Sequence, residues 1–417
     1  MKNSVNGSSP HLPLTPTRTE RTEKSEEALN VKSTGLSGSE LVTNREYRVR
    51  LLDDVSSARS LPSPEGVAGS NSDLPVSVGA EPSIDSTLPA YEATSTVALR
   101  DTDGTTWLET PLGPAFEDGQ LDLNKITPEM ISSLTPQQRR ELTDQLKTLQ
   151  VDFEAEYSSG EQTQGTESAD FYLANFLLGK EGGDKAAAQL FAANPEMLDG
   201  LLGSGQPMAP GEGSLAPLVR AISSNLDTVV DDMRSTNPDG EPWETRELEG
   251  LGTLMALDME AGLYQKDEFG HITRRDPNHE DAAEIALRYT NALGARDDTE
   301  IGAFSGVMLN GLFKFFEETG LHGRDQGAFF QTMAGLLASG AAIASPVASF
   351  VVTLGAEIAG PDGAGSNNST QFLGRLTSEL KRSWAVQEGR GEITREQQNE
   401  RETWFEIGLG QYIYGYD

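Results

Sequence analysis

Histidine is the side chain best suited to acid–base or metal chemistry near neutral pH, and this chain has four of them. They are His11, His271, His279 and His322. His279 and Glu280 open like the helix of a zinc protease, which places its second histidine four residues after the first. That position is Ala283 here, so the motif is incomplete. A hydrolase that pairs serine with histidine would have to use one of the last three histidines, because His11 lies in a polar tail.

Short glycine motifs also fail to complete a catalytic or cofactor-binding pattern. The segment Gly302–Gly306 carries its serine one place later than a nucleophile elbow requires. Gly203–Gly205 continues with Gln206–Met208, so it completes neither a dinucleotide loop nor a phosphate loop. We therefore expect no cofactor, and the motifs leave the catalytic residues of any enzyme unknown.

Carboxylates are abundant, with 65 aspartates and glutamates in the chain. Asp101 and Asp103 resemble the start of a calcium loop, but Gly104 comes too early for that loop. Asp231–Asp232 and Glu317–Glu318 are expected to be solvated helix ends, so we expect no metal site. A hydrolase that uses Asp or Glu with one histidine stays an alternative, because sequence does not reveal which acids have raised pKa values.

The composition restricts the classes of partner. The chain of 417 residues has a formal net charge of -33 and a sequence pI near 4.4. Binding to a phosphate backbone needs a basic face, so we expect no nucleic-acid partner. The same charge repels an anionic membrane surface. The absence of cysteine excludes disulfides, thiolate catalysis and cysteine-ligated metals, and it suits both the cytosol and exported bacterial proteins that refold outside.

Residues 1–93 are rich in Ser, Thr, Pro, Gly, Asn and Glu. Such a segment cannot bury enough apolar surface to offset the entropy of ordering, so we expect a disordered N-terminal tail. No apolar run follows Met1 and Lys2, so we expect no cleavable secretory signal. This composition is typical of an uncleaved export signal and also of a simple linker. The alternating residues 46–52 are a candidate docking strand for a secretion chaperone.

A short β-hairpin region is expected over 94–124, turning at Asp103–Gly104, because Asp-Gly between strand-like runs is a strong hairpin signal. A helical domain over 125–417 follows, and one alternative divides it into sub-domains 125–235 and 243–417. Thr127–Pro128 and Thr135–Pro136 each place a cap residue before a first-turn proline. Apolar periodicity predicts further helices at 171–178, 184–193, 195–203, 215–233, 243–263, 281–293, 301–318, 373–384 and 394–405. A loop is expected at 158–166 and a hairpin at 264–276.

No charged residue stands between Asp325 and Glu357. Pro346 divides this stretch, so each half has the length of a helix buried in a soluble domain. Small residues such as Gly335 and Ala338 let backbones approach closely, which fits both the centre of a bundle and a membrane hairpin. We expect a buried helical pair over 326–359, with membrane contact through this pair as the alternative.

The expected fold class is mainly α: an irregular multi-helix bundle with minor β-hairpins, preceded by the long disordered tail. The leading functional hypothesis is an exported bacterial protein, effector-like or associated with secretion, that binds a protein partner through its helical body. It would be secreted without a cleavable signal peptide, and a cytoplasmic location is the alternative. The alternative functions are a membrane-active or pore-forming protein that inserts 326–359, and the hydrolase described above.

Overall fold

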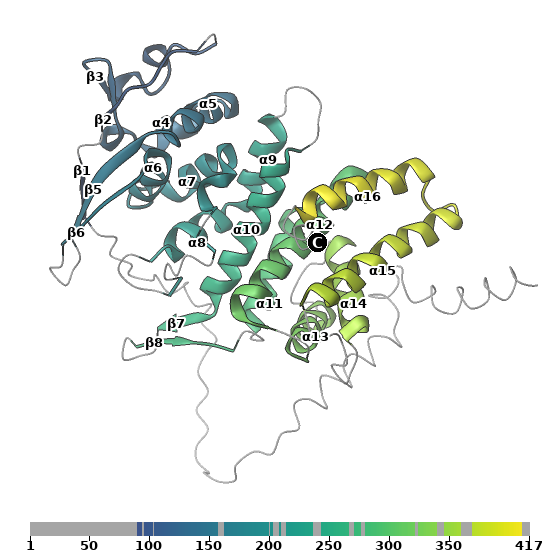
Figure 1. Ribbon diagram of the computed structural model, residues 1–417. Coiled ribbons are helices and arrows are strands. Elements are labelled where there is room, and N and C mark those ends of the chain that lie inside the picture. Colours follow the sequence, from purple (N-terminus) through teal and green to yellow (C-terminus); the bar gives the residue numbers. More distant parts are fainter. Residues whose placement is uncertain are drawn as a thin grey trace, which may run out of the picture.

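The computed structural model describes residues 90–93, 96–102, 104–156, 162–199, 201–202, 208–209, 214–236, 243–266, 271–276, 280–321, 324–339, 346–359 and 369–410. This part of the chain is mainly α-helical, with three small antiparallel sheets (Figure 1), which confirms the predicted fold class. The predicted tail lies outside the described residues up to position 89, and Ala90–Ala93 forms strand β1. The C-terminal residues 411–417 also lie outside them.

The N-terminal hairpin forms at a different Asp-Gly pair from the predicted one. Strand β3 (Phe116–Glu117) pairs with β4 (Gln120–Asp122), and β4 also pairs with β2 (Thr96–Val97). Asp118 and Gly119 have φ values of 50° and 81°, as a two-residue type I′ turn requires. The region 94–124 contains two Asp-Gly pairs, and the one that lies between paired strands is Asp118–Gly119.

The predicted strand after Gly104 is wrong, because Trp107–Glu109 forms the 3-10 helix η1. The Trp107 side chain is buried, and its Nε1 donates a hydrogen bond to the Arg100 carbonyl oxygen at 2.9 Å. Its backbone N–H donates to Asp101 Oδ1 at 3.0 Å. These two bonds fold the segment back on itself, so it cannot extend beside β2. The 3-10 helices η2 (Gly113–Ala115) and η3 (Leu123–Lys125) follow it.

A second hairpin lies where we expected a loop. Strands β5 (Gln150–Glu156) and β6 (Gln162–Ser168) are antiparallel, with Val151 opposite Glu167, and β1 pairs with the other edge of β5. The loop predicted at 158–166 is therefore wrong from residue 162 onward. The segment Gln162–Ser168 is polar and lacks the large alternating side chains that predict a strand, so its pairing comes from β5 and not from its own composition.

The first helices begin where their cap residues predict. Helix α4 (Pro128–Ser133) is capped by Thr127, whose side chain accepts from the Met130 N–H. Helix α5 (Pro136–Leu146) starts with a full capping box between Thr135 and Gln138. Both predictions are confirmed, because the cap and the first-turn proline are local interactions.

The next group comprises α6 (Ala169–Leu178), α7 (Gly183–Ala193), the 3-10 helix η4 (Pro195–Leu198), α8 (Ala216–Ser224) and α9 (Leu226–Thr236). We predicted one helix over 215–233, and the chain breaks at Asn225 between α8 and α9. The Asn225 side chain donates to the Ala221 carbonyl oxygen at 2.9 Å and so takes the place of a backbone donor. The helix predicted at 195–203 is also wrong in type, since η4 is a single short 3-10 segment.

The central helices match their predicted ranges within a few residues. They are α10 (Thr245–Gly262), α11 (Glu280–Ala292) and α12 (Asp298–Thr319). Between α10 and α11 lies the predicted hairpin, formed by β7 (Tyr264–Lys266) and β8 (Ile272–Arg274). Helix α12 is buried along most of its length, which confirms it as a core helix.

Helix α16 (Arg395–Leu409) packs along α12 (Figure 1), and the two backbones approach closely at glycines. A Cβ atom on Gly302 would collide with the Arg401 carbonyl oxygen, and one on Gly408 would collide with that of Ala303. The segment Gly302–Gly306, which resembled a nucleophile elbow, is therefore a helix-crossing surface. Its Ser305 hydroxyl donates to the Ile301 carbonyl oxygen of its own helix at 2.6 Å.

The uncharged span forms α13 (Arg324–Ser339) and α14 (Pro346–Ala359), and Pro346 is the first residue of α14. Helix α15 (Ser369–Gly389) follows. Phe316 of α12, Phe329 and Phe330 of α13, and Phe372 of α15 form a continuous cluster of aromatic contacts with centroids 5.4 to 6.3 Å apart. Within the described ranges, no helix combines the length and the apolar character needed to cross a membrane. Membrane contact through 326–359 stays a prediction.

Candidate functional site

A pocket of about 890 Å³ lies between α8, the C-terminal end of α10, one face of α11 and the β7–β8 hairpin, with Leu336 of α13 contributing to its wall. Figure 1 shows these elements grouped on the side of the body from which the hairpin extends. The volume is within the range of sites that bind small molecules or peptide side chains. Its lining combines guanidinium groups, carboxylates and hydroxyls with the apolar side chains of Ile285 and Leu336.

The most buried charge in this lining is Asp258 of α10, a residue that is 2% exposed. Arg288 Nη2 donates both to Asp258 Oδ2 and, at 3.2 Å, to the Ser223 hydroxyl. Burial raises the pKa of Asp258, although the positive charge of Arg288 acts in the opposite direction. The pair thus fixes Arg288, whose side chain is 47% exposed, at the pocket wall.

Tyr289 lies behind this pair and is fully buried. Burial, together with the negative charge of Asp258, raises the pKa of its phenol well above the usual value. The phenol therefore stays neutral at physiological pH. It supports the wall of the pocket from inside the core.

A second ion pair connects the hairpin to α11. Arg275 forms an ion pair with Asp281 and donates to Gln265 Oε1 from Nε at 2.9 Å. Its backbone N–H donates to the Leu263 carbonyl oxygen at 2.6 Å. These bonds hold the β7–β8 hairpin against the start of α11 and so define one rim of the pocket.

Two lining charges have no ion-pair partner within the described residues. Arg220 of α8 donates from Nη2 to the Ala261 carbonyl oxygen at 3.1 Å, and no carboxylate lies within ion-pair distance of it there. Glu284 of α11 is exposed. The pocket therefore presents one unpaired cation and one unpaired anion beside two neutralised pairs.

Helical spacing explains how the sequence assembles this lining. Asp281, Glu284, Ile285 and Arg288 lie three or four residues apart, so they share one face of α11. Arg220, Ser223 and Ser224 do the same on α8. The helical pattern over 215–233 puts Arg220 on a polar face, but it does not place that face near α11. The polar i, i+3, i+4 pattern on both helices could have indicated the pocket lining, but the same pattern is typical of a solvated face.

The described residues that the sequence suggested for chemistry do not line this pocket. His271 is exposed, directly before β8, and does not line the pocket, while His11, His279 and His322 lie outside the described residues. Glu317 and Glu318 are exposed, as predicted. In the described ranges, no group of three His, Cys, Asp or Glu residues could hold a metal ion.

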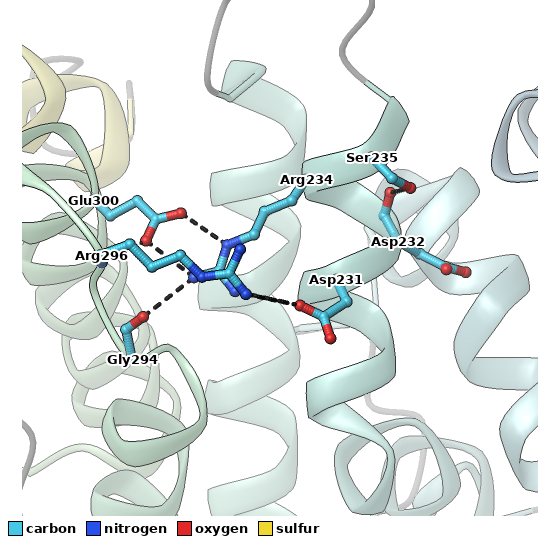
Figure 2. Close-up of polar contacts among 7 residues, drawn as sticks. All are labelled: Asp231, Asp232, Arg234, Ser235, Gly294, Arg296 and Glu300. Atoms are coloured by element: carbon cyan, nitrogen blue, oxygen red, sulfur yellow. Dashed lines mark hydrogen bonds and ion pairs between the residues drawn. The ribbon is translucent and has the colours of Figure 1, made fainter.

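Asp231 and Asp232 were both predicted to be solvated, and this is wrong for Asp232. Its side chain is 18% exposed and pairs with the buried Arg139, with Nη2 and Oδ2 2.5 Å apart. Burial raises the pKa of Asp232, with Arg139 opposing the change. Asp231 is exposed and interacts with Arg234 and Arg296 (Figure 2).

Figure 2 shows that this second cluster of charges joins α9 to the start of α12. Glu300 is 5% exposed and accepts from Arg234 Nε at 2.7 Å and from Arg234 Nη2 at 3.0 Å. The backbone N–H of Arg296 donates to the same carboxylate at 2.7 Å. The guanidinium of Arg234 also lies 5.8 Å from the Trp243 ring centroid. These donors occupy the Glu300 carboxylate. The cluster therefore has a structural role, which is to hold α9 against the start of α12.

Comparisons with protein-family models, with curated proteins and with solved structures find no match for this chain.

Proposed function

We propose that this chain is an exported bacterial protein that acts by binding a protein partner with its helical body, and that the surface of the partner is basic. The N-terminal composition supports the export half of the proposal. The distribution of charge in the folded part supports the binding half. The two halves are tested separately below.

The observation that carries the binding half is an excess of acidic over basic side chains on the surface of the described part of the chain. Ion pairs with little solvent exposure join helices distant in sequence: Arg139 with Asp232, Arg140 with Glu247, Arg234 with Glu300 and Arg401 with Asp298. Among the described residues, exposed acidic side chains outnumber exposed basic ones. The excess negative charge of the described part is thus presented to solvent, where it attracts cationic surfaces over about a Debye length.

The pocket described above is a separate feature of the body, because its arginines favour an anionic group and not a basic protein surface. Its guanidinium groups are donors in fixed positions, and Arg288 is oriented by the buried Asp258. Arginine is well suited to recognition because it stays charged and presents several donors in one plane.

A capture experiment tests the binding half. The purified chain is immobilised, and bound proteins are eluted by raising the salt concentration. A matched pair of variants is run beside it: D227N/E317Q removes two exposed acids, and R375Q/R395Q removes two exposed bases. All four residues are exposed and make no ion pair in the described part of the chain.

We expect a basic protein that is released by salt, is retained less by D227N/E317Q and is retained more by R375Q/R395Q. Capture of an acidic protein, or of one whose retention is the same for both variants, would contradict the proposal. The export half is tested by fusing residues 1–95 to a reporter. Secretion of the fusion by the source cell is the expected result, and its retention by every secretion route would refute export.

A further inference from the structure

We propose that the pocket between α8, α10 and α11 binds a zwitterion, either a free amino acid or a short peptide with an apolar side chain. Arg220 and Arg288 would hold its carboxylate, and Glu284 its ammonium group. This inference concerns a small-ligand site and does not depend on the protein partner proposed above.

The carboxylate end follows from unused donors on two arginines. Both hydrogen bonds that Arg288 makes within the described residues use Nη2, and the bond from Arg220 to Ala261 also uses Nη2. The Nε and Nη1 groups of both side chains are therefore free to donate. Two guanidinium groups that line one pocket are a strong site for a carboxylate, because charge-assisted bonds to planar donors are about twice as strong as neutral ones.

Asp258 lowers the local positive charge without filling this site. It pairs with Arg288 and also experiences the charge of Arg220. One buried carboxylate thus balances one of the two guanidinium groups and leaves a single net positive charge at this end of the pocket. A ligand with one negative charge neutralises it, whereas a dianion would leave an excess.

The ammonium end follows from Glu284. This carboxylate lies one helical turn from Arg288 on the pocket face of α11, and it makes no ion pair in the described part of the chain. A ligand cation beside it would complete the charge balance of the pocket. The lining of the pocket also includes Ile285 and Leu336, which favours an apolar side chain on the ligand.

Isothermal titration of the full chain with four probes tests the assignment: L-leucine, trileucine, N-acetyl-L-leucine and L-leucine amide. The last two lack the ammonium and the carboxylate respectively. We expect L-leucine or trileucine to bind at least tenfold more tightly than either blocked form. Tighter binding of trileucine identifies a peptide site, and equal or tighter binding of L-leucine identifies an amino-acid site.

Two variants assign the roles of the side chains. R220Q should weaken the binding of L-leucine and of N-acetyl-L-leucine at least tenfold. E284Q should weaken the binding of L-leucine and of L-leucine amide but leave the affinity for N-acetyl-L-leucine unchanged. Glu280 is exposed on the same helix and does not line the pocket, so E280Q serves as the matched control and should leave all affinities unchanged.

Because Glu284 is exposed, E284Q also keeps the test valid if R220Q fails to fold. Three results would overturn the proposal. They are equal affinities for blocked and unblocked leucine, an affinity for L-leucine that E284Q does not change, and no heat of binding for any probe at concentrations up to about 10 mM.

Discussion

Gly306 of α12 lies against the backbone of Phe405 in α16, so that a Cβ atom on Gly306 would come within 2.5 Å of the Phe405 carbonyl oxygen. The Leu409 backbone nitrogen would lie 2.6 Å from the same atom. The two helices therefore pack through backbone atoms at this point, and the neighbours are too rigid to give way.

We expect G306A to destabilise the protein by about 1–3 kcal/mol, the usual cost of inserting a methyl group into a packed core. The matched control is G374A on α15, where a Cβ atom would meet nothing within 4 Å. That change should stabilise the helix by about 0.5–1 kcal/mol. Urea unfolding measures both. Equal stabilities of the two variants would show that α16 does not pack on α12 in this way.

The Glu300 carboxylate should contribute strongly to stability, because it is buried and satisfies two donors of Arg234 and the N–H of Arg296 (Figure 2). E300Q would leave Arg234 without its buried counter-ion, with only the exposed Asp231 as an ion-pair partner in the described part of the chain, and should cost about 3–5 kcal/mol in the free energy of unfolding. D231N removes an ion-pair partner of the same arginines whose side chain is 66% exposed, so it should cost less than about 1 kcal/mol. If D231N costs as much as E300Q, the cluster is not organised around Glu300.

Alanine in place of Gly104 and alanine in place of Gly119 should have different effects on stability. Gly119 has φ of +81° in the turn between β3 and β4, so G119A should destabilise by about 1–2 kcal/mol. Gly104 has no positive φ and has open space around it, so G104A should be close to neutral. Thermal unfolding of the two variants tests this prediction. A larger loss of stability for G104A than for G119A would support the hairpin predicted at Asp103–Gly104.

Glu260 of α10 gives the stability a specific pH dependence. Burial and the negative charge of Glu318 raise the pKa of Glu260 from 4.5 to about 7, with Arg274 opposing the change. The folded state therefore binds this proton more tightly than the unfolded state. Stability should fall as pH rises from 4.5 to 7, since ionising Glu260 in the folded state is unfavourable.

The variant E260Q should accordingly be more stable than the original chain at pH 8, by about 1–3 kcal/mol, and similar to it at pH 4.5. The exposed Glu317 provides the control, because E317Q should change stability little at either pH. The measurement is urea unfolding across this pH range. A difference between E260Q and the original chain that does not vary with pH would show that Glu260 titrates normally.

Local chemistry explains which parts of the fold the sequence could predict. Thr127 and Thr135 start α4 and α5 as expected, because a cap hydroxyl and a proline act within one helical turn. The apolar stripe of α12 was also visible, since Phe304, Met308, Leu312 and Phe315 recur at helical spacing and are all buried.

Contacts that hydrophobic periodicity and turn signals do not encode explain the errors. Strand β6 forms because it pairs with β5. Trp107 is not in the predicted strand, because its indole N–H donates a hydrogen bond to the Arg100 carbonyl oxygen. The break at Asn225 depends on one side-chain bond that competes with the helix. The pocket was not predictable for the same reason, because Arg220 and Arg288 come to line one pocket only through the packing of α8 and α11 against α10.

The central claim is that the uncharged span forms part of the core of a helical body that acts through its surface. The cysteine-free chain allows this to be tested by single-cysteine labelling on α13, at buried Ala334 and at exposed Gln331. We expect the Q331C thiol to react with maleimide at the rate of an exposed thiol, and the A334C thiol to react about a hundredfold more slowly, through local opening alone. Equal rates for the two thiols would contradict the account.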